Sequence, residues 1–198
     1  MRITHKIKDL KILFTKDQFY IKQYYKLRQE SFRVDNGWTD YDGSETECDK
    51  KSHIIIALDG DQFIGGIKIM LESECDYFSC ETPNSKYIYR KYLEFKNETT
   101  PLNTIAEISS LVVSKEYRNS FVSLGLANCA IEFAKSRKIN YIFSIASEFH
   151  CRIHKLIYKR IGYNAMVGMN YPWKKEEKYS NIETFLIYIK IPQLPTIE

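Results

Sequence analysis

The feature that most constrains the fold is a strand, a helix and a second strand in the middle of the chain. The segment TIAEISSLVV, residues 104–113, is apolar and is typical of a strand. Residues 122–137 place apolar and small side chains on one helical face, and NYIFSIA, residues 140–146, is typical of a buried strand. Two strands of one sheet that are joined by a helix run parallel. The sequence therefore predicts a central parallel pair.

Antiparallel hairpins are predicted on both sides of this pair. Residues 53–71 read HIIIALDGDQFIGGIKIML, in which two β-rich runs flank DGDQ. Residues 163–169 and 182–190 are two further candidate strands. Other helices are predicted at residues 18–32, 86–95 and 148–161, and a long loop at residues 33–52. We expect one α+β domain over residues 1–198, with a mixed, mostly antiparallel sheet and helices on both faces.

Composition excludes several classes of protein. The formal charge of +4 is too small for the concentrated basic face of a nucleic-acid-binding protein. The start, MRITHKIKDLKILF, lacks the apolar core of a signal peptide, and no apolar run approaches the ~20 residues that span a membrane. Five cysteines without a CxxC pair predict free thiols in a cytoplasmic protein. The fifteen Tyr and eleven Phe fit either an aromatic core or a pocket for an apolar ligand.

The segment SKEYRNSFVSLGLA, residues 114–127, joins the first central strand to its helix. A strand, a turn and a helix start can hold a phosphate with backbone N–H groups. Such loops usually carry glycine where the ligand comes closest, but Phe121 lies in the middle of this one.

These patterns resemble the GCN5-related N-acyltransferase (GNAT) superfamily. Val113 is followed five positions later by Arg118 and then by a small-residue helix start, and IYKRIGY, residues 157–163, resembles the superfamily's Tyr-x-x-Leu-Gly-Phe ending of its last helix. The resemblance covers about residues 17–190. It implies acyl transfer from a thioester to an amine, with the donor's pantetheine arm beside a central strand that is splayed from its neighbour.

A narrower resemblance is to the acyl-homoserine lactone synthases and long-chain N-acyl amino acid synthases. LRQESFRVDNGW carries Arg28, Phe32 and Trp38 at the matching spacing, Asp49 matches an acidic motif, and AEISSLVV matches at Glu107 and Ser109. Lys68 and Ser110 stand where those synthases carry arginine, which puts homoserine lactone production and the use of S-adenosylmethionine in doubt.

The resemblance implies a role for each site residue. Glu107 is the candidate base and Tyr158 the candidate acid that protonates the leaving thiolate. Arg28, Phe32 and Trp38 line the acceptor side, where Arg28 either clamps a carboxylate or stacks on an aromatic ring. Donor binding is assigned to backbone groups of Leu111, Val112, Val113, Arg118, Asn119, Ser120, Ser123, Leu124 and Gly125.

No prosthetic cofactor is expected, because the acyl-CoA or acyl-carrier protein is a co-substrate. His150 and His154 lie four apart but lack an evident third metal ligand, so no metal site is predicted. Arg152, Lys155 and Lys159 form a basic stripe that fits either an acidic acyl carrier protein or solvent.

Three functions fit the sequence. One is transfer of a medium or long acyl chain to an amino acid or similar small amine. The others are acetyl-CoA-dependent N-acetylation and a non-catalytic binding domain of the same fold.

Overall fold

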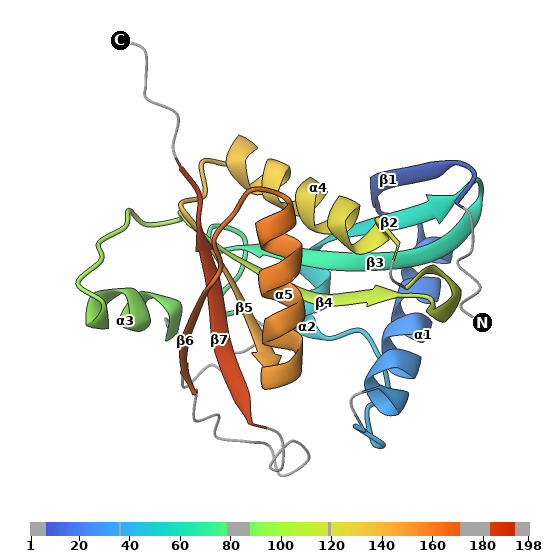
Figure 1. The fold of residues 1–198 in the computed structure, drawn as a ribbon, viewed down its shortest axis with the longest axis horizontal. Coiled ribbons are helices and arrows are strands. Elements are labelled where there is room, and N and C mark those ends of the chain that lie inside the picture. Colours follow the sequence, from blue (N-terminus) through green and yellow to red (C-terminus); the bar gives the residue numbers. More distant parts are fainter. Residues whose placement is uncertain (1–6, 36, 79–87, 119, 171–182, 193–198) are drawn as a thin grey trace.

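One seven-stranded sheet forms the centre of the protein, in the order β1-β2-β3-β4-β5-β7-β6 (Figure 1). The computed structural model describes residues 7–35, 37–78, 88–118, 120–170 and 183–192. The strands are β1 (Leu10–Thr15), β2 (His53–Asp59), β3 (Gln62–Leu71), β4 (Ile105–Val113), β5 (Tyr141–Ser147), β6 (Met166–Asn170) and β7 (Thr184–Lys190). Only β4 and β5 pair in parallel, which confirms the predicted mixed sheet with its central parallel pair.

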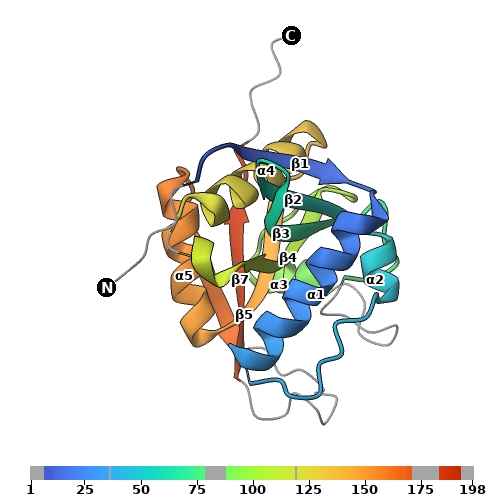
Figure 2. The same ribbon diagram turned by 90° about the vertical axis from the view of Figure 1, so that its right-hand side faces the viewer.

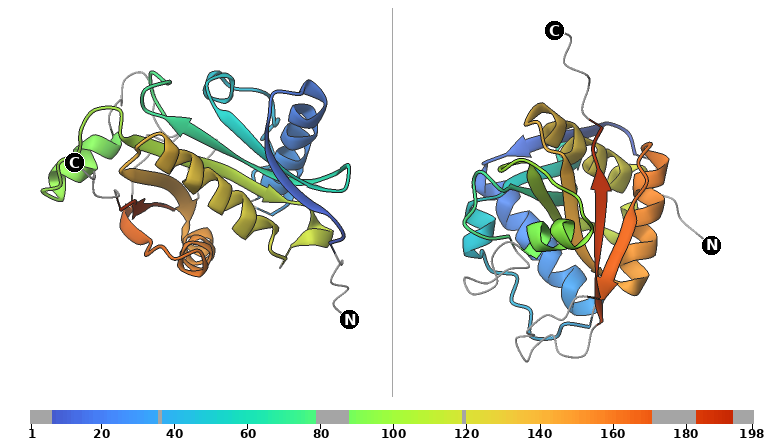
Figure 3. Two further views of the ribbon diagram at one scale, coloured as in Figure 1. Left: turned by 90° about the horizontal axis from the view of Figure 1, so that it is seen from above. Right: turned by 90° about the vertical axis from the view of Figure 1, so that its left-hand side faces the viewer.

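Helices cover both faces of the sheet (Figure 2 and Figure 3). They are α1 (Gln18–Val34), α2 (Glu47–Lys50), α3 (Ile88–Phe95), α4 (Val122–Ser136) and α5 (Glu148–Arg160), with a 3-10 turn, η1 (Lys115–Tyr117). On one face α1 packs against β2, β3 and β4, whereas α4 and α5 lie on the other face. None of the helices in the described ranges is both long and apolar enough to cross a membrane.

Two elements escaped the sequence-based prediction. Strand β1 pairs antiparallel with β2 at the edge of the sheet, where Leu10, Leu13 and Phe14 are exposed. Exposure on both faces removes the alternation that marks a half-buried strand. Helix α2 is one turn long and begins at a capping box between Thr46 and Asp49, so it lies inside the segment predicted as loop.

The core divides between the two faces of the sheet. On the α4 and α5 face it is mainly aliphatic and includes Ala106 and Ile108 of β4. On the α3 face it is strongly aromatic, with Tyr89, Phe143 and Tyr188 packed together. A large share of the aromatic residues therefore builds core.

Strand β4 changes direction at a bulge. Gly66 lies opposite Val112 but Lys68 lies opposite Ser109, so two steps along β3 match three along β4. Ser110 takes up the extra residue with a left-handed φ of 54°, and its carbonyl oxygen accepts a hydrogen bond from the Tyr24 hydroxyl at 2.9 Å.

The bulge separates β4 from β5. The parallel register runs only from Ile105 to Glu107, after which the two strands diverge (Figure 1). We call the region between residues 108–113 of β4 and residues 144–147 of β5 the fork. Backbone groups of β4 that face the fork have no ladder partner on β5.

Close packing of Tyr24 on Gly66 supports this geometry, and a Gly66→Ala substitution tests it. A Cβ at Gly66 would lie 2.6 Å from a ring carbon of Tyr24 and 3.1 Å from the Ile55 carbonyl oxygen. We expect a loss of about 1–3 kcal/mol in the free energy of unfolding, measured by urea denaturation. Gly125→Ala is the matched control, because the atom it meets is the flexible Cδ1 of Ile12. An equal or larger loss in the control would contradict this account.

Candidate active site

The apex of the fork is closed by a side chain of β5. Ser144 is buried and donates from Oγ to the carbonyl oxygen of Ile108 at 2.7 Å. The Tyr158 side chain, carried by α5, is buried in the same cluster as Ile108, near Ser144. Burial raises the pKa of Tyr158, and the interaction with Ser144 opposes the rise. Tyr158 is therefore a protonated phenol at the apex at neutral pH.

Glu107 is the last residue of β4 that pairs with β5, and it is buried. Its Oε2 accepts a hydrogen bond from the Tyr89 hydroxyl at 2.7 Å, whereas Oε1 has no hydrogen-bond partner among the described residues. The Tyr89 ring stacks on Phe143 with centroids 4.4 Å apart, and Phe143 lies opposite Glu107 in the parallel ladder. A buried carboxylate oxygen without a donor is costly, so Oε1 marks a place for a ligand.

The two candidate catalytic residues approach the fork from opposite faces of the sheet. Side chains of β4 alternate, so Ala106 and Ile108 face α4 while Glu107 faces Tyr89. Tyr158 packs in the same cluster as Ile108. A ligand contacts both residues only where the strands have parted, which is beyond Glu107.

A buried charge cluster lies on the Glu107 face. Asp49 accepts hydrogen bonds from Arg28 at 2.8 and 2.9 Å, from Lys68 at 2.8 Å and from the Thr46 N–H at 2.9 Å. Burial alone would raise the pKa of Asp49, but the hydrogen bonds from Arg28 and the charges of Lys68 and Arg28 outweigh burial. The pKa of this carboxyl therefore lies well below its usual range.

Arg28 is the bidentate hydrogen-bond partner of Asp49 in this cluster. Both terminal nitrogens of the guanidinium bond Asp49 or the carbonyls of Gly43 and Ser44, and the residue is 1% exposed. The guanidinium also lies 4.6 Å from the Tyr25 ring centre. Both terminal nitrogens are thus engaged, whereas Nε has no hydrogen-bond partner among the described residues, and the predicted carboxylate clamp stays a prediction.

Phe32 and Trp38, the other predicted acceptor-side residues, belong to an aromatic group at the end of α1. Their ring centres are 5.1 Å apart, and Phe32 lies 4.8 Å from Tyr41. Both are half-buried. The structure therefore places Phe32 and Trp38 next to each other at the end of α1.

The loop predicted to bind phosphate uses much of its own hydrogen-bonding capacity. The N–H groups of Arg118 and Ser120 donate to carbonyls three residues earlier, and that of Gly125 donates to Phe121. Gly125 instead makes room for β1, since a Cβ there would meet Ile12. The N–H groups of Ser123 and Leu124 stand in the first turn of α4 and donate to no acceptor among the described residues.

The Arg118 and Phe121 side chains of this loop lie in different environments. The Arg118 guanidinium donates from Nε to the Val113 carbonyl at 3.1 Å and pairs with Asp35 at the end of α1, at 2.6 Å. Phe121 is 74% exposed. Asn119 lies outside the described residues, so its predicted role has no structural counterpart here.

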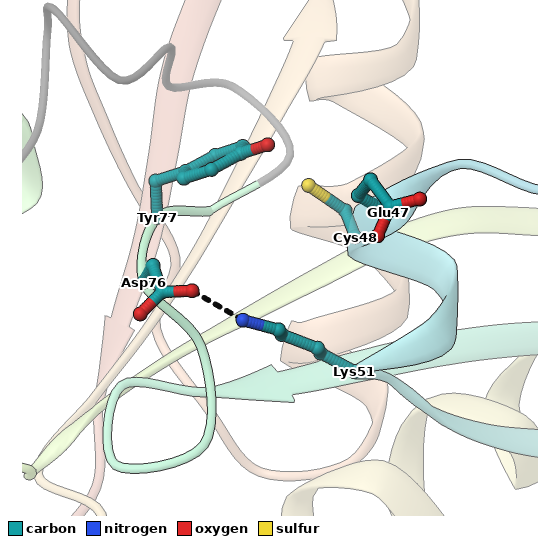
Figure 4. Close-up of a pocket in the computed structure, with 5 residues that line it drawn as sticks. All are labelled: Glu47, Cys48, Lys51, Asp76 and Tyr77. Atoms are coloured by element: carbon teal, nitrogen blue, oxygen red, sulfur yellow. Dashed lines mark hydrogen bonds and ion pairs between the residues drawn. The ribbon is translucent and has the colours of Figure 1, made fainter.

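A small pocket opens on the Glu107 face, between α2 and the segment after β3 (Figure 4). Its volume is about 130 Å³, and its lining residues are Glu47, Cys48, Lys51, Asp76 and Tyr77. An ion pair between Lys51 and Asp76 forms one wall. Cys48 is half-buried, and burial raises the pKa of its thiol, with smaller and opposite effects from the charges of Lys68 and Glu107. Cys48 and Lys51 come from the same short helix as Asp49, which bonds Lys68 of β3.

His150 and His154 lie one turn apart on α5. The Nδ1 of His150 is 2.8 Å from the Ser147 hydroxyl, and burial, with a smaller contribution from His150, lowers the pKa of His154 to about 4. Within the described ranges, no group of three or more His, Cys, Asp and Glu side chains is placed to hold a metal. Arg152, Lys155 and Lys159 are exposed on α5.

Tyr89 carries no motif signal in the sequence, yet it contacts Glu107. A Tyr89→Phe substitution removes the hydroxyl but keeps the ring on Phe143, leaving both carboxylate oxygens of Glu107 without a donor among the described residues. We expect a loss of about 1–3 kcal/mol in the free energy of unfolding by urea denaturation at pH 7. Tyr92→Phe, one turn along α3, is the control with a smaller effect, because the Tyr92 hydroxyl interacts with the neutral Tyr188 side chain. Equal effects would contradict the assigned contact.

The charge cluster predicts a pH dependence of stability. An Asp49→Asn substitution leaves Arg28 and Lys68 buried without their anion, so we expect a loss of about 3–5 kcal/mol at pH 7. Because the pKa of Asp49 is depressed in the folded state, its contribution is complete above the unfolded value near 3.8 and falls as the pH drops further. Urea denaturation from pH 7 to pH 3 should therefore show the two proteins converging below about pH 4. A constant difference would contradict this account.

Comparisons with known proteins place the architecture. No protein-family model matches the sequence, and no curated protein matches it significantly. Solved structures do match. FeeM, an N-acyl amino acid synthase from uncultured soil microbes, has a TM-score of 0.61 at 11% identity, with 93% of this chain and 92% of that chain covered. BjaI, a CoA-dependent acyl-homoserine lactone synthase solved with SAM and isopentyl-CoA, has a TM-score of 0.63 at 16% identity, with 89% and 78% covered.

An acetyltransferase of the GNAT family from Streptococcus pneumoniae has a TM-score of 0.56 at 15% identity, with 92% of this chain and all 100% of that chain covered. At these identities the likeness speaks for the fold. Together with the mixed seven-stranded sheet and its parallel pair β4 and β5, it shows that this chain has the fold of the GCN5-related N-acyltransferase superfamily.

Proposed function

We propose that the protein is an N-acyltransferase that moves an acyl group from an acyl thioester to the amine of an amino acid or similar small molecule. The observation that carries this proposal is the fork, with an unpaired carboxylate oxygen of Glu107 on one side and the Tyr158 phenol at its apex. Acyl transfer to an amine needs a proton acceptor and a proton donor on either side of one carbonyl.

The donor arm is assigned to the open edge of β4. A pantetheine arm carries amides that can pair with the fork-facing groups of Leu111, Val112 and Val113 as an added strand would. Its phosphate then reaches the start of α4, where the N–H groups of Ser123 and Leu124 and the helix dipole favour an anion. The proposed phosphate site thus lies within the loop and helix start predicted from the sequence, but its contacts are limited to the N–H groups of Ser123 and Leu124.

The reaction balances with these two residues. The amine nitrogen attacks the thioester carbonyl carbon, and a C–N bond forms while the C–S bond breaks. Glu107 Oε1 takes the proton that the amine loses, directly or through a water. The Tyr158 hydroxyl gives its proton to the departing thiolate. Arg28 has a positioning role, because it donates hydrogen bonds to Asp49, which in turn accepts one from Lys68.

A second candidate is acetyl-CoA-dependent N-acetylation. The bond between Ser144 and Ile108 closes the apex of the fork, which favours a short acyl group over a long chain that must turn aside. An acyl-carrier protein as donor is favoured by the exposed Phe121, since a single phosphodiester needs less of the loop than a pyrophosphate does. The length of the acyl group that the protein transfers therefore distinguishes N-acetylation from transfer of a longer chain.

Thiol release tests the proposal. The protein is mixed with acetyl-CoA, long-chain acyl-CoA or acyl-carrier protein and a panel of amines, and free thiol is measured. We expect release with at least one donor and a fall of about 10²- to 10⁴-fold in kcat for Glu107→Gln and for Tyr158→Phe. Tyr163→Phe, just beyond α5, serves as the control. Absence of thiol release with every donor and amine would sink the proposal.

A further inference from the structure

Helix α5 has an outer face that takes no part in the chemistry proposed above. Its inner side packs on β5 and β7 and carries Tyr158, whereas its outer side points away from the sheet (Figure 1 and Figure 3). Phe149 and Leu156 lie on the outer side and are 67% and 60% exposed. They recur at the i, i+7 spacing of one helical face, with Ile153 half-buried between them. We call these three residues the apolar row.

Basic side chains run beside the apolar row. Arg152, Lys155 and Lys159 are exposed at spacings of three and four, and Arg160 is exposed in the last turn. Glu148 is the one acidic residue of α5, and it pairs with Arg152 at 2.6 Å. Four cations against one anion leave the outer face positively charged.

This combination fits a lipid surface better than solvent or a protein partner. A solvated face needs no large apolar side chains, and exposed ones are ordinarily scattered singly rather than aligned along a helix. A protein partner would need a groove of matching shape. A bilayer needs no shape match, because its anionic headgroups meet the cations while the boundary of its acyl chains receives the apolar side chains.

We propose that the outer face of α5 binds the surface of a membrane that contains anionic lipids. The helix lies in the plane of the headgroups without crossing the bilayer, and the apolar row is directed into it. Tyr158 lies on the side of α5 opposite Phe149, and a helix is about 10–12 Å across. The bound membrane is therefore about one helix width from the apex of the fork. The inference does not depend on acyl transfer, so its test needs no activity.

Vesicle binding tests the inference. The full chain is sedimented with vesicles of phosphatidylcholine alone, or of phosphatidylcholine and phosphatidylglycerol in equal parts, at about 0.1 M and about 1 M salt. At the lower salt we expect binding to the anionic vesicles and about 10-fold less binding to the neutral ones, and at the higher salt we expect the difference to vanish. No binding to anionic vesicles at the lower salt would overturn the inference.

Matched charge variants locate the surface. Lys155→Glu combined with Lys159→Glu reverses two cations of α5 and should lower the partition into anionic vesicles by about 10- to 100-fold. Lys22→Glu combined with Lys26→Glu makes the same change in net charge at exposed positions of α1, on the other face of the sheet, and should have a much smaller effect. Equal losses in the two double variants would mean that net charge alone drives binding, which contradicts the assignment to α5.

A tryptophan probe tests the depth of insertion. Phe149→Trp places an indole in the apolar row, and brominated acyl chains in the anionic vesicles should quench the fluorescence that it adds to that of the unaltered protein. Phe19→Trp is the control, because Phe19 is 65% exposed on α1, and thermal unfolding checks that each variant is folded. Quenching at position 19 but not at position 149 would overturn the inference. Capture by immobilised acyl-carrier protein without vesicle binding would assign the face to an acidic protein instead, and would overturn it as well.

Discussion

Strand β4 is hydrogen-bonded on both sides only as far as Glu107, and the remaining residues of the strand pair with β3 alone. The separation depends on one extra residue, Ser110, whose left-handed backbone bends the strand away from β5. Tyr24 from α1 bonds the Ser110 carbonyl and fits only because Gly66 has no side chain. A helix on one face thus maintains an opening in the sheet, and the donor and catalytic groups we assign are all placed relative to it.

Electrostatics on the α1 and α3 face follow from burial. Asp49 forms ion pairs with Arg28 and Lys68. Burying these three charges costs desolvation free energy, which the four hydrogen bonds that Asp49 accepts offset. The cations are not equivalent, since Arg28 bonds Asp49 with both terminal nitrogens whereas Lys68 has N–H groups to spare. With Glu107 held by Tyr89, two opposite charges are kept apart in a buried place.

Local patterns predicted the sheet and the central helices because they depend on periodicity and turn residues. Val113 and Arg118 located the loop, and IYKRIGY located Tyr158 at the apex of the fork. The side chains that contact Glu107 and Arg28 could not be predicted from local sequence patterns. Tyr89 meets Glu107 and Asp49 meets Arg28 from elements 18 and 21 residues away, and neither pair leaves a periodic trace. The anion that Arg28 meets, Asp49, could not be predicted either, because a sequence shows that a buried arginine needs an anion but not which one.

The central claim is that the fork-facing edge of β4 receives the donor's pantetheine arm. Hydrogen–deuterium exchange of the amides from Ser109 to Val113 tests it most directly, recorded with and without a non-hydrolysable acyl-CoA or acyl-pantetheine. The account predicts slower exchange in this segment and at Ser123 and Leu124 when the donor is bound, with the edge strand β1 unchanged. Unaltered exchange along β4 with saturating donor, or protection confined to β1, would contradict it.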